Sequence, residues 1–90
     1  MAMMLERHRF EIARIYVPVK RAKDLDQGRV ETLAEDMLEH GQTTPISVRL
    51  DRRADGTERY VLVEGLHRIE ALKALGETTV TGIVVQPRIR

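Results

Sequence analysis

The sequence predicts a single small α+β domain in which a mixed sheet packs against helices, with the element order β-α-β-β-α-β. Two stretches, 28–40 and 66–75, carry apolar residues at the spacing of a helix face. Four others are rich in β-branched residues or alternate apolar with polar ones: 11–17, 46–50, 60–63 and 79–85. A chain of 90 residues provides only one hydrophobic core, so no second domain is expected.

The first 27 residues are predicted to contain one strand. Residues 1–10 are expected to form a basic, flexible lead-in, so the limits of the domain are placed at 11–90. Residues 11–17 are expected to form a strand that Pro18 ends. Residues 20–27 are expected to form a charged loop.

The first helix is predicted at residues 28–40. Its apolar residues recur at i, i+3, i+4, i+7 and i+8 and therefore share one face: Val30, Leu33, Ala34, Met37 and Leu38. Asp24 or Asp26 can cap the start of this helix. Gly41 stands where a glycine commonly ends a helix.

Residues 46–63 are predicted to form a β-hairpin, with Asp55-Gly56 at its turn. Gly65 separates the hairpin from a compact helix that ends at Gly76. The buried face of that helix carries four residues at intervals of three: Leu66, Ile69, Leu72 and Leu75. A β-branched strand is expected at 79–85, where Pro87 stops it.

Composition excludes several classes of protein. The chain has no cysteine, which excludes disulfides, thiol catalysis and thiolate metal sites. No run of about 18 apolar residues and no secretory signal is found, so we expect a cytoplasmic protein without membrane contact. The net charge is only +1, although residues 1–23 carry +4 and residues 24–40 carry −5. This balance does not favour a dedicated nucleic-acid binder, which usually shows a clear basic excess.

The segment Glu64-Gly65-Leu66-His67-Arg68 is the strongest candidate for a site. His67 and Arg68 fall in the first turn of a predicted helix, where the helix dipole favours acidic residues instead. An oxyanion at this turn would be held by free backbone N–H groups, the imidazole and the guanidinium, and Gly65 would allow close approach. The alternative is that both side chains are simply solvated at a common strand–glycine–helix turn.

These residues resemble the ParB/sulfiredoxin-like domain family, whose members carry Gly-Glu-Arg-Arg, Gly-Cys-His-Arg or Asp-Gly-x-His-Arg at this point. The Asp-Gly-x-His-Arg group is the nearest match, with Glu64 replacing the aspartate. Three upstream stretches are similar to family motifs in the same order: Val17-Pro18-Val19, the helix 30–41 and Thr44-Pro45-Ile46-Ser47-Val48-Arg49. The resemblance covers about residues 12–85.

The resemblance implies nucleotide chemistry. Partition proteins of the ParB type bind CTP and clamp on DNA, sulfiredoxins use ATP on a sulfinic acid, and free-serine kinases carry the Asp-Gly-x-His-Arg form. Leu66 stands where sulfiredoxins have their cysteine, which excludes that activity here. His67 stands where CTP-binding partition proteins usually have arginine, so cytosine specificity cannot be carried over.

Roles for the site residues follow from their chemistry and from the resemblance. Gly65, Leu66, His67 and Arg68 are expected to hold the phosphates of ATP or CTP with Mg²⁺, with Arg68 as the main clamp. Glu64 and His67 are the candidate catalytic residues, as a base or water-orienting group and as an acid. Glu64 paired with a neighbouring arginine is the structural alternative.

Two further pairs of residues lie in loops that could reach the nucleotide. Thr43 and Thr44 lie in the loop that approaches the nucleotide in the family, although turn bonding before Pro45 would also explain them. Lys20 and Arg21 can reach the phosphates from the first loop, or lie solvated. Neither His8 nor His40 has a second ligand at metal spacing, so no metal bound by the protein alone is expected.

The leading hypothesis is a nucleotide-binding, partition-like or regulatory module that carries no DNA-reading helix-turn-helix in this chain. One alternative is a Mg²⁺-dependent enzyme of phosphoryl transfer or nucleotide hydrolysis. Another is a ParB-like DNA-binding protein or nuclease. The resemblance leaves open a homodimer, and a DNA or protein partner reached through a separate domain.

Overall fold

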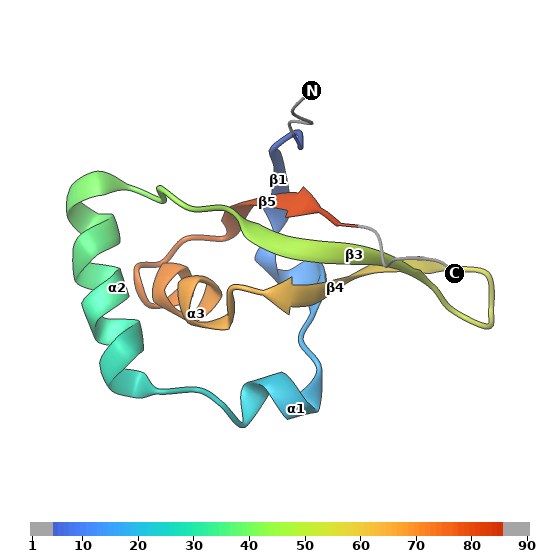
Figure 1. The fold of residues 1–90 in the computed structure, drawn as a ribbon, viewed down its shortest axis with the longest axis horizontal. Helices are drawn as coiled ribbons and strands as arrows, with labels where there is room; N and C mark the ends of the chain where they lie inside the picture. Colours follow the sequence, from blue (N-terminus) through green and yellow to red (C-terminus); the bar gives the residue numbers. More distant parts are fainter. Residues whose placement is uncertain (1–4, 86–90) are drawn as a thin grey trace.

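The computed structural model describes residues 5–85, which fold around a five-stranded mixed sheet of order β1-β5-β3-β4-β2 (Figure 1). The strands are β1 His8–Glu11, β2 Ile15–Tyr16, β3 Ile46–Arg52, β4 Glu58–Glu64 and β5 Thr79–Val84. The central strand β3 pairs antiparallel with β4 and parallel with β5. At the edges, β1 runs antiparallel to β5 and β2 parallel to β4. The predicted α+β class with a mixed sheet is confirmed.

Three α-helices accompany the sheet: α1 Val19–Ala22, α2 Gln27–His40 and α3 Leu66–Ala74. Figure 1 shows α2 and α3 side by side at one end of the sheet, with α1 leading into α2. A short 3-10 turn, η1 Ile12–Arg14, joins β1 to β2. None of the helices in residues 5–85 combines the length and apolarity needed to cross a membrane.

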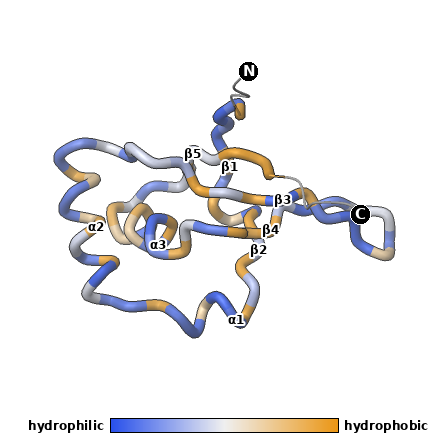
Figure 2. The backbone as a smooth tube through the Cα atoms, in the orientation of Figure 1, coloured by the Kyte–Doolittle hydropathy of each residue, from blue (hydrophilic) through white to orange (hydrophobic). Residues whose placement is uncertain are grey.

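The hydrophobic core lies between α2, α3 and the middle of the sheet. Ile46 and Val48 of β3 are fully buried, and Ile69 of α3 and Val80 of β5 are nearly so. Figure 2 shows α2 as hydrophilic over most of its length, with apolar residues at intervals. This pattern is that of a helix with one face in the core. Its buried members, Val30 and Met37, are two of the five predicted for that face.

The ends of α2 agree closely with the sequence. Asp26 is its N-cap, because Oδ1 of its side chain accepts hydrogen bonds from the N–H groups of Gly28 and Arg29 at 3.0 and 3.3 Å. Gly41 follows the helix with a φ of 72°, and its N–H donates to the carbonyl of Met37. The predicted hairpin is also present, as β3 and β4 joined through the turn at Gly56.

The N-terminal region differs from the prediction. The expected lead-in extended to residue 10, but His8 to Phe10 belong to β1, where His8 lies opposite Gly82. Phe10 anchors this strand, because its ring packs edge-on against Tyr60 with centroids 4.9 Å apart. Residues 1–4 of the expected lead-in, and Pro87 at the other end, lie outside the described residues.

Residues 11–27 also contain more structure than expected. The single strand predicted at 11–17 is divided into the last residue of β1, the turn η1 and the two-residue strand β2. The expected loop at 20–27 contains α1, which starts directly after Pro18. Proline fixes its own φ near the helical value and is favoured at helix starts. None of the residues of α1 is buried, which explains why no apolar period announces it.

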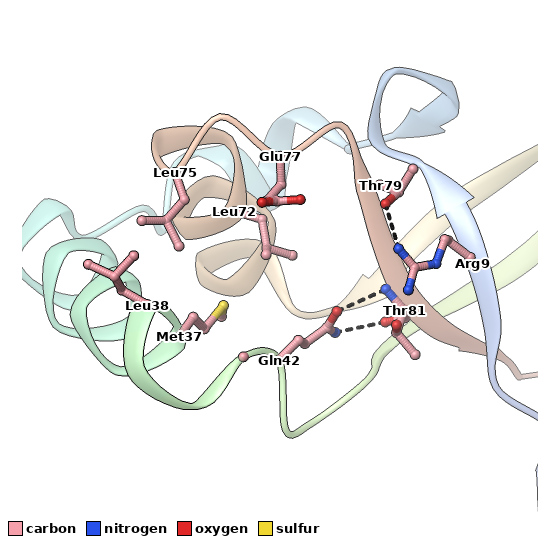
Figure 3. A pocket seen from close by; sticks show the side chains of 10 residues that line it. Arg9, Met37, Leu38, Gln42, Leu72, Leu75, Glu77, Thr79 and Thr81 are labelled. Atoms are coloured by element: carbon pink, nitrogen blue, oxygen red, sulfur yellow. Dashed lines mark hydrogen bonds between the residues drawn. The ribbon is translucent and has the colours of Figure 1, made fainter.

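Gln42 connects the end of α2 to the sheet (Figure 3). Its side-chain amide donates to the carbonyl of Thr81 at 2.8 Å, and its Oε1 accepts from the N–H of Thr81 at 2.9 Å. One side chain thus makes the two hydrogen bonds that a neighbouring strand would make with β5. This contact fixes the loop between α2 and β3 against the start of β5.

Candidate functional site

A pocket of about 350 Å³ lies where the first turns of α2 and α3 meet the segment after α1. Arg21 and Asp24 line it from α1 and the following loop, and Arg29 and Leu33 line it from α2. The segment Glu64–Arg68 completes the pocket. The structure therefore brings Arg21 together with the whole predicted motif, although they are more than forty positions apart in the sequence.

Gly65 is required at the base of this pocket for two reasons. Its φ is 120°, a conformation that residues with a side chain rarely adopt. A Cβ atom at this position would lie 2.5 Å from Cγ2 and 2.8 Å from Cβ of Ile46. The absent side chain lets the turn between β4 and α3 pack directly against the buried Ile46 of β3.

The start of α3 has unpartnered hydrogen-bond donors. Gly65 precedes the helix and provides no side-chain cap. The first N–H of α3 that bonds back to the chain is that of Ile69, to the carbonyl of Gly65. The N–H groups of the preceding three residues, Leu66 to Arg68, therefore have no helical partner and carry the positive end of the helix dipole. Such a terminus fits an oxyanion.

His67 lines the pocket and also holds it together. Its Nε2 accepts a hydrogen bond of 3.1 Å from the backbone N–H of Asp26, the N-cap of α2. Because Nε2 is the acceptor in this contact, Nδ1 is the ring nitrogen left to donate to a ligand.

Arg68 also has a structural contact. Its Nη1 donates to the carbonyl of Pro45 at 3.0 Å, which places the half-buried guanidinium beside the entry to β3. Arg68 lines both the main pocket and a smaller adjoining cavity of about 40 Å³. Thr43 and Thr44 line that smaller cavity, so these predicted residues lie near Arg68 but not in the main pocket.

The remaining predicted residues differ in where they lie relative to the pocket. Leu66 is 91% buried in the core, so only its backbone can face a ligand. Glu64 is exposed at the rim of the pocket, and the described residues offer it no ion-pair partner within 4.0 Å. Lys20 lies outside this pocket and lines a groove on the sheet instead.

Arg29 is a pocket residue that the sequence analysis did not select. It lies in the first turn of α2, as the third helical residue. A cation there opposes the helix dipole, as His67 and Arg68 do in α3. A search for cations in the first turn of the predicted helix 28–40 would therefore have selected Arg29 from the sequence. With Arg29 included, three guanidinium groups face the carboxylates of Asp24 and Glu64 around one pocket.

Within residues 5–85, no three side chains of His, Asp or Glu are grouped so as to hold a metal ion. Oxygen ligands for a divalent cation at this pocket would have to come largely from a bound anion and water.

Comparisons with known proteins agree with this fold. The model of the ParB N-terminal domain matches residues 6–89. No curated protein sequence gives a significant match. Sulfiredoxin from Arabidopsis thaliana has a similar structure, with a TM-score of 0.74 and 27% identity over 91% of this chain and 86% of that one.

Two further structures share the fold at lower identity. ParB from Caulobacter crescentus, solved with CTP-gamma-S, gives a TM-score of 0.73 and 24% identity over 92% of this chain and 46% of that one. A free serine kinase in complex with AMP gives a TM-score of 0.70 and 19% identity over 92% of this chain and 32% of that one. The chain thus spans less than half of these two proteins. Because the family model covers nearly all of its length and the architecture agrees, this chain belongs to the ParB N-terminal domain family and has the ParB/sulfiredoxin-like fold.

Proposed function

We propose that this chain is a nucleotide-binding, partition-like or regulatory domain that holds the phosphates of ATP or CTP, with Mg²⁺, at the start of α3. The observation that carries the proposal is the uncapped N-terminus of α3 beside three arginines, Arg21, Arg29 and Arg68. Guanidinium groups bind phosphate oxygens through paired N–H donors.

The residues present fit a polyphosphate. The N–H groups of Leu66 to Arg68 at the start of α3 have no helical partner, and all three residues line the pocket. The three arginines come from three different elements, so they can contact more than one phosphate group. Mg²⁺ would be held through phosphate oxygens and water, and the carboxylates that line the pocket are those of Asp24 and Glu64.

The related structures support a nucleotide as the ligand. ParB from Caulobacter crescentus was solved with CTP-gamma-S, and the free serine kinase with AMP. Those two ligands differ in their base, and the pocket described here is defined by its phosphate-binding groups. We therefore propose the nucleotide class, with ATP and CTP as the two candidates. A homodimer and a DNA or protein partner belong to the same proposal.

The decisive variant is Arg29→Gln, because the described structure shows no hydrogen bond or ion pair made by its side chain. The wild-type chain should bind one of ATP, CTP, ADP or GTP, each with Mg²⁺, in a calorimetric titration. Arg29→Gln should weaken that binding about tenfold or more. Lys23→Gln removes the same charge from the same region but does not line the pocket, and should bind normally.

Two results would contradict the proposal. One is the absence of a binding signal with all four nucleotides. The other is an unchanged affinity for nucleotide in both single variants, Arg29→Gln and Arg21→Gln. Thermal melts of each variant separate a lost contact from a lost fold. A steep fall in affinity for a DNA duplex with salt, in the absence of nucleotide binding, would favour the DNA-binding alternative instead.

A further inference from the structure

A second pocket, of about 430 Å³, lies at the opposite ends of the same two helices (Figure 3). Met37 and Leu38 line it from the last turns of α2, and Leu72 and Leu75 line it from the end of α3. Along α2, Leu33 lines the first pocket and Met37 lines this one, so four residues, about 6 Å of helix, separate the two linings. None of its lining residues is shared with that first pocket.

Two opposite charges line this second pocket without neutralising each other. Arg9 reaches it from β1, and Glu77 reaches it from the loop after α3; Figure 3 shows both side chains at its rim. Within residues 5–85, neither side chain has an ion-pair partner within 4.0 Å, so they do not pair with one another. A ligand with one anionic and one cationic group can satisfy both.

The polar side of the pocket is held in position. Nη1 of Arg9 donates to Oγ1 of Thr79 at 3.2 Å, which directs the guanidinium along β5. Gln42 fixes the adjoining backbone at Thr81 through two hydrogen bonds. A site formed before the ligand arrives loses less conformational entropy on binding.

The apolar side of the pocket is incompletely covered. Met37 and Leu72 are each 7% exposed, but Leu38 beside them is 75% exposed. A surface leucine next to a partly polar pocket provides contact area for an aliphatic group of a ligand.

The helix dipoles select the orientation of a ligand. The C-terminal ends of α2 and α3 carry partial negative charge, which favours a cation and disfavours a phosphate. An ammonium group would therefore lie near Glu77, and a carboxylate would be bound by the planar fork of Arg9. We propose that this pocket binds a free α-amino acid with an aliphatic side chain, whose carboxylate contacts Arg9, whose ammonium contacts Glu77, and whose side chain covers Leu38.

The test is a titration of the ¹⁵N-labelled chain with L-leucine, followed by amide chemical shifts. The amides of Gln42, Leu75 and Thr81 should shift, and those of residues 65–68 should not. Leucinamide lacks the carboxylate and N-acetyl-leucine lacks the ammonium. Each should bind about tenfold more weakly than leucine.

Two variants test the contacts directly. Glu77→Gln and Arg9→Gln should each weaken leucine binding about tenfold. Glu35→Gln and Arg7→Gln remove the same charges from exposed positions outside the pocket and should leave it unchanged. The side chain of Glu77 has no hydrogen-bond partner in the described structure, so Glu77→Gln does not threaten the fold.

Three outcomes would overturn the proposal: no shifts at millimolar leucine, equal binding of N-acetyl-leucine, or unchanged affinity in both variants. Inorganic phosphate that shifts the same amides would identify a simple anion site, and would also overturn it. The nucleotide titration reports on a different set of amides, so the two proposals succeed or fail independently.

Discussion

The backbone N–H of Asp26 donates to Nε2 of His67 over 3.1 Å, so the residue that caps α2 is tied to the first turn of α3. The same Asp26 accepts two hydrogen bonds from α2 through its carboxylate. One residue thus sets both the start of α2 and its position relative to α3. The pocket at residues 64–68 depends on this link, because Arg29 and His67, which line it, belong to the two helices that the bond joins.

Replacing His67 with leucine should destabilise the domain by about 1 kcal/mol, because the N–H of Asp26 loses its acceptor. The side chain of glutamine carries an acceptor at a similar reach, so His67→Gln should recover part of this loss. Urea unfolding of the three proteins measures the difference. Equal stability of wild type and His67→Leu would show that the bond contributes nothing.

Replacing Gly65 with alanine should destabilise the domain by about 2 kcal/mol or more. The new Cβ would meet Ile46 at 2.5 Å, and the φ of 120° is strained for alanine. Gly76→Ala is the matched control, because Gly76 also has a positive φ but has no atom within 4 Å of a Cβ. Gly76→Ala should lower the stability of the domain only by the strain of alanine at a positive φ. Thermal unfolding of the two variants distinguishes them, and equal losses would contradict the steric argument.

Replacing Gln42 with methionine should destabilise the domain by about 2 kcal/mol. The change keeps the length of the side chain but leaves the N–H and carbonyl of Thr81 without the two bonds at 2.9 and 2.8 Å. Gln27→Met, in the exposed first turn of α2, should be nearly neutral. Denaturant unfolding provides the comparison, and a loss below about 0.5 kcal/mol in Gln42→Met would contradict this prediction.

The stability that Asp55 contributes to the hairpin turn should decrease at acidic pH. The hydroxyl and the N–H of Thr57 both donate to the carboxylate of Asp55, at 2.6 and 2.9 Å, and lower the pKa of Asp55 below its usual 3.8. A carboxylate with a lowered pKa stabilises the folded state above its unfolded pKa, and that stabilisation is lost as the pH falls through the folded value. Removing the hydroxyl in Thr57→Val should move the pKa of Asp55 back toward 3.8.

Carboxyl ¹³C shifts recorded during an acid titration follow Asp55 directly. The wild-type midpoint should lie below 3.8, and the Thr57→Val midpoint should lie above that of the wild type. Identical midpoints in the two proteins would assign the effect to another cause.

The sequence predicts the long elements well because the spacing of their apolar residues follows which side chains are buried. The apolar period of 28–40 and the alternation of 46–50 correspond to α2 and β3 within a few residues. The short elements β2 and α1 lack such a signal. β2 has two residues, and none of the residues of α1 is buried. β2 is placed by its pairing with β4, which no local pattern displays. Pro18 precedes α1, but the sequence analysis used it only as the end of a strand.

Of the residues that line the candidate pocket, the sequence analysis selected the contiguous segment 64–68 and Arg21, but not Arg29 or Asp24. Residues 64–68 are contiguous, and all five line one pocket. Arg29 and Asp24 reach that pocket only because α2 begins beside α3. The bond between Asp26 and His67 spans 41 positions, and nothing in either local sequence indicates it. Such contacts become visible only once the packing of the two helices is known.

The order of strands in the sheet has a kinetic consequence. β3 and β4 form a local hairpin, whereas β1 reaches β5 from almost the opposite end of the chain. Closing so long a loop costs more entropy than forming the hairpin, and it gains only a four-residue strand. Pairing of β1 should therefore be the last step of folding and the first to be undone. The pocket at residues 64–68 has no lining residue in β1 or β5, so this opening should leave it intact, whereas the pocket at Arg9 should be lost with it.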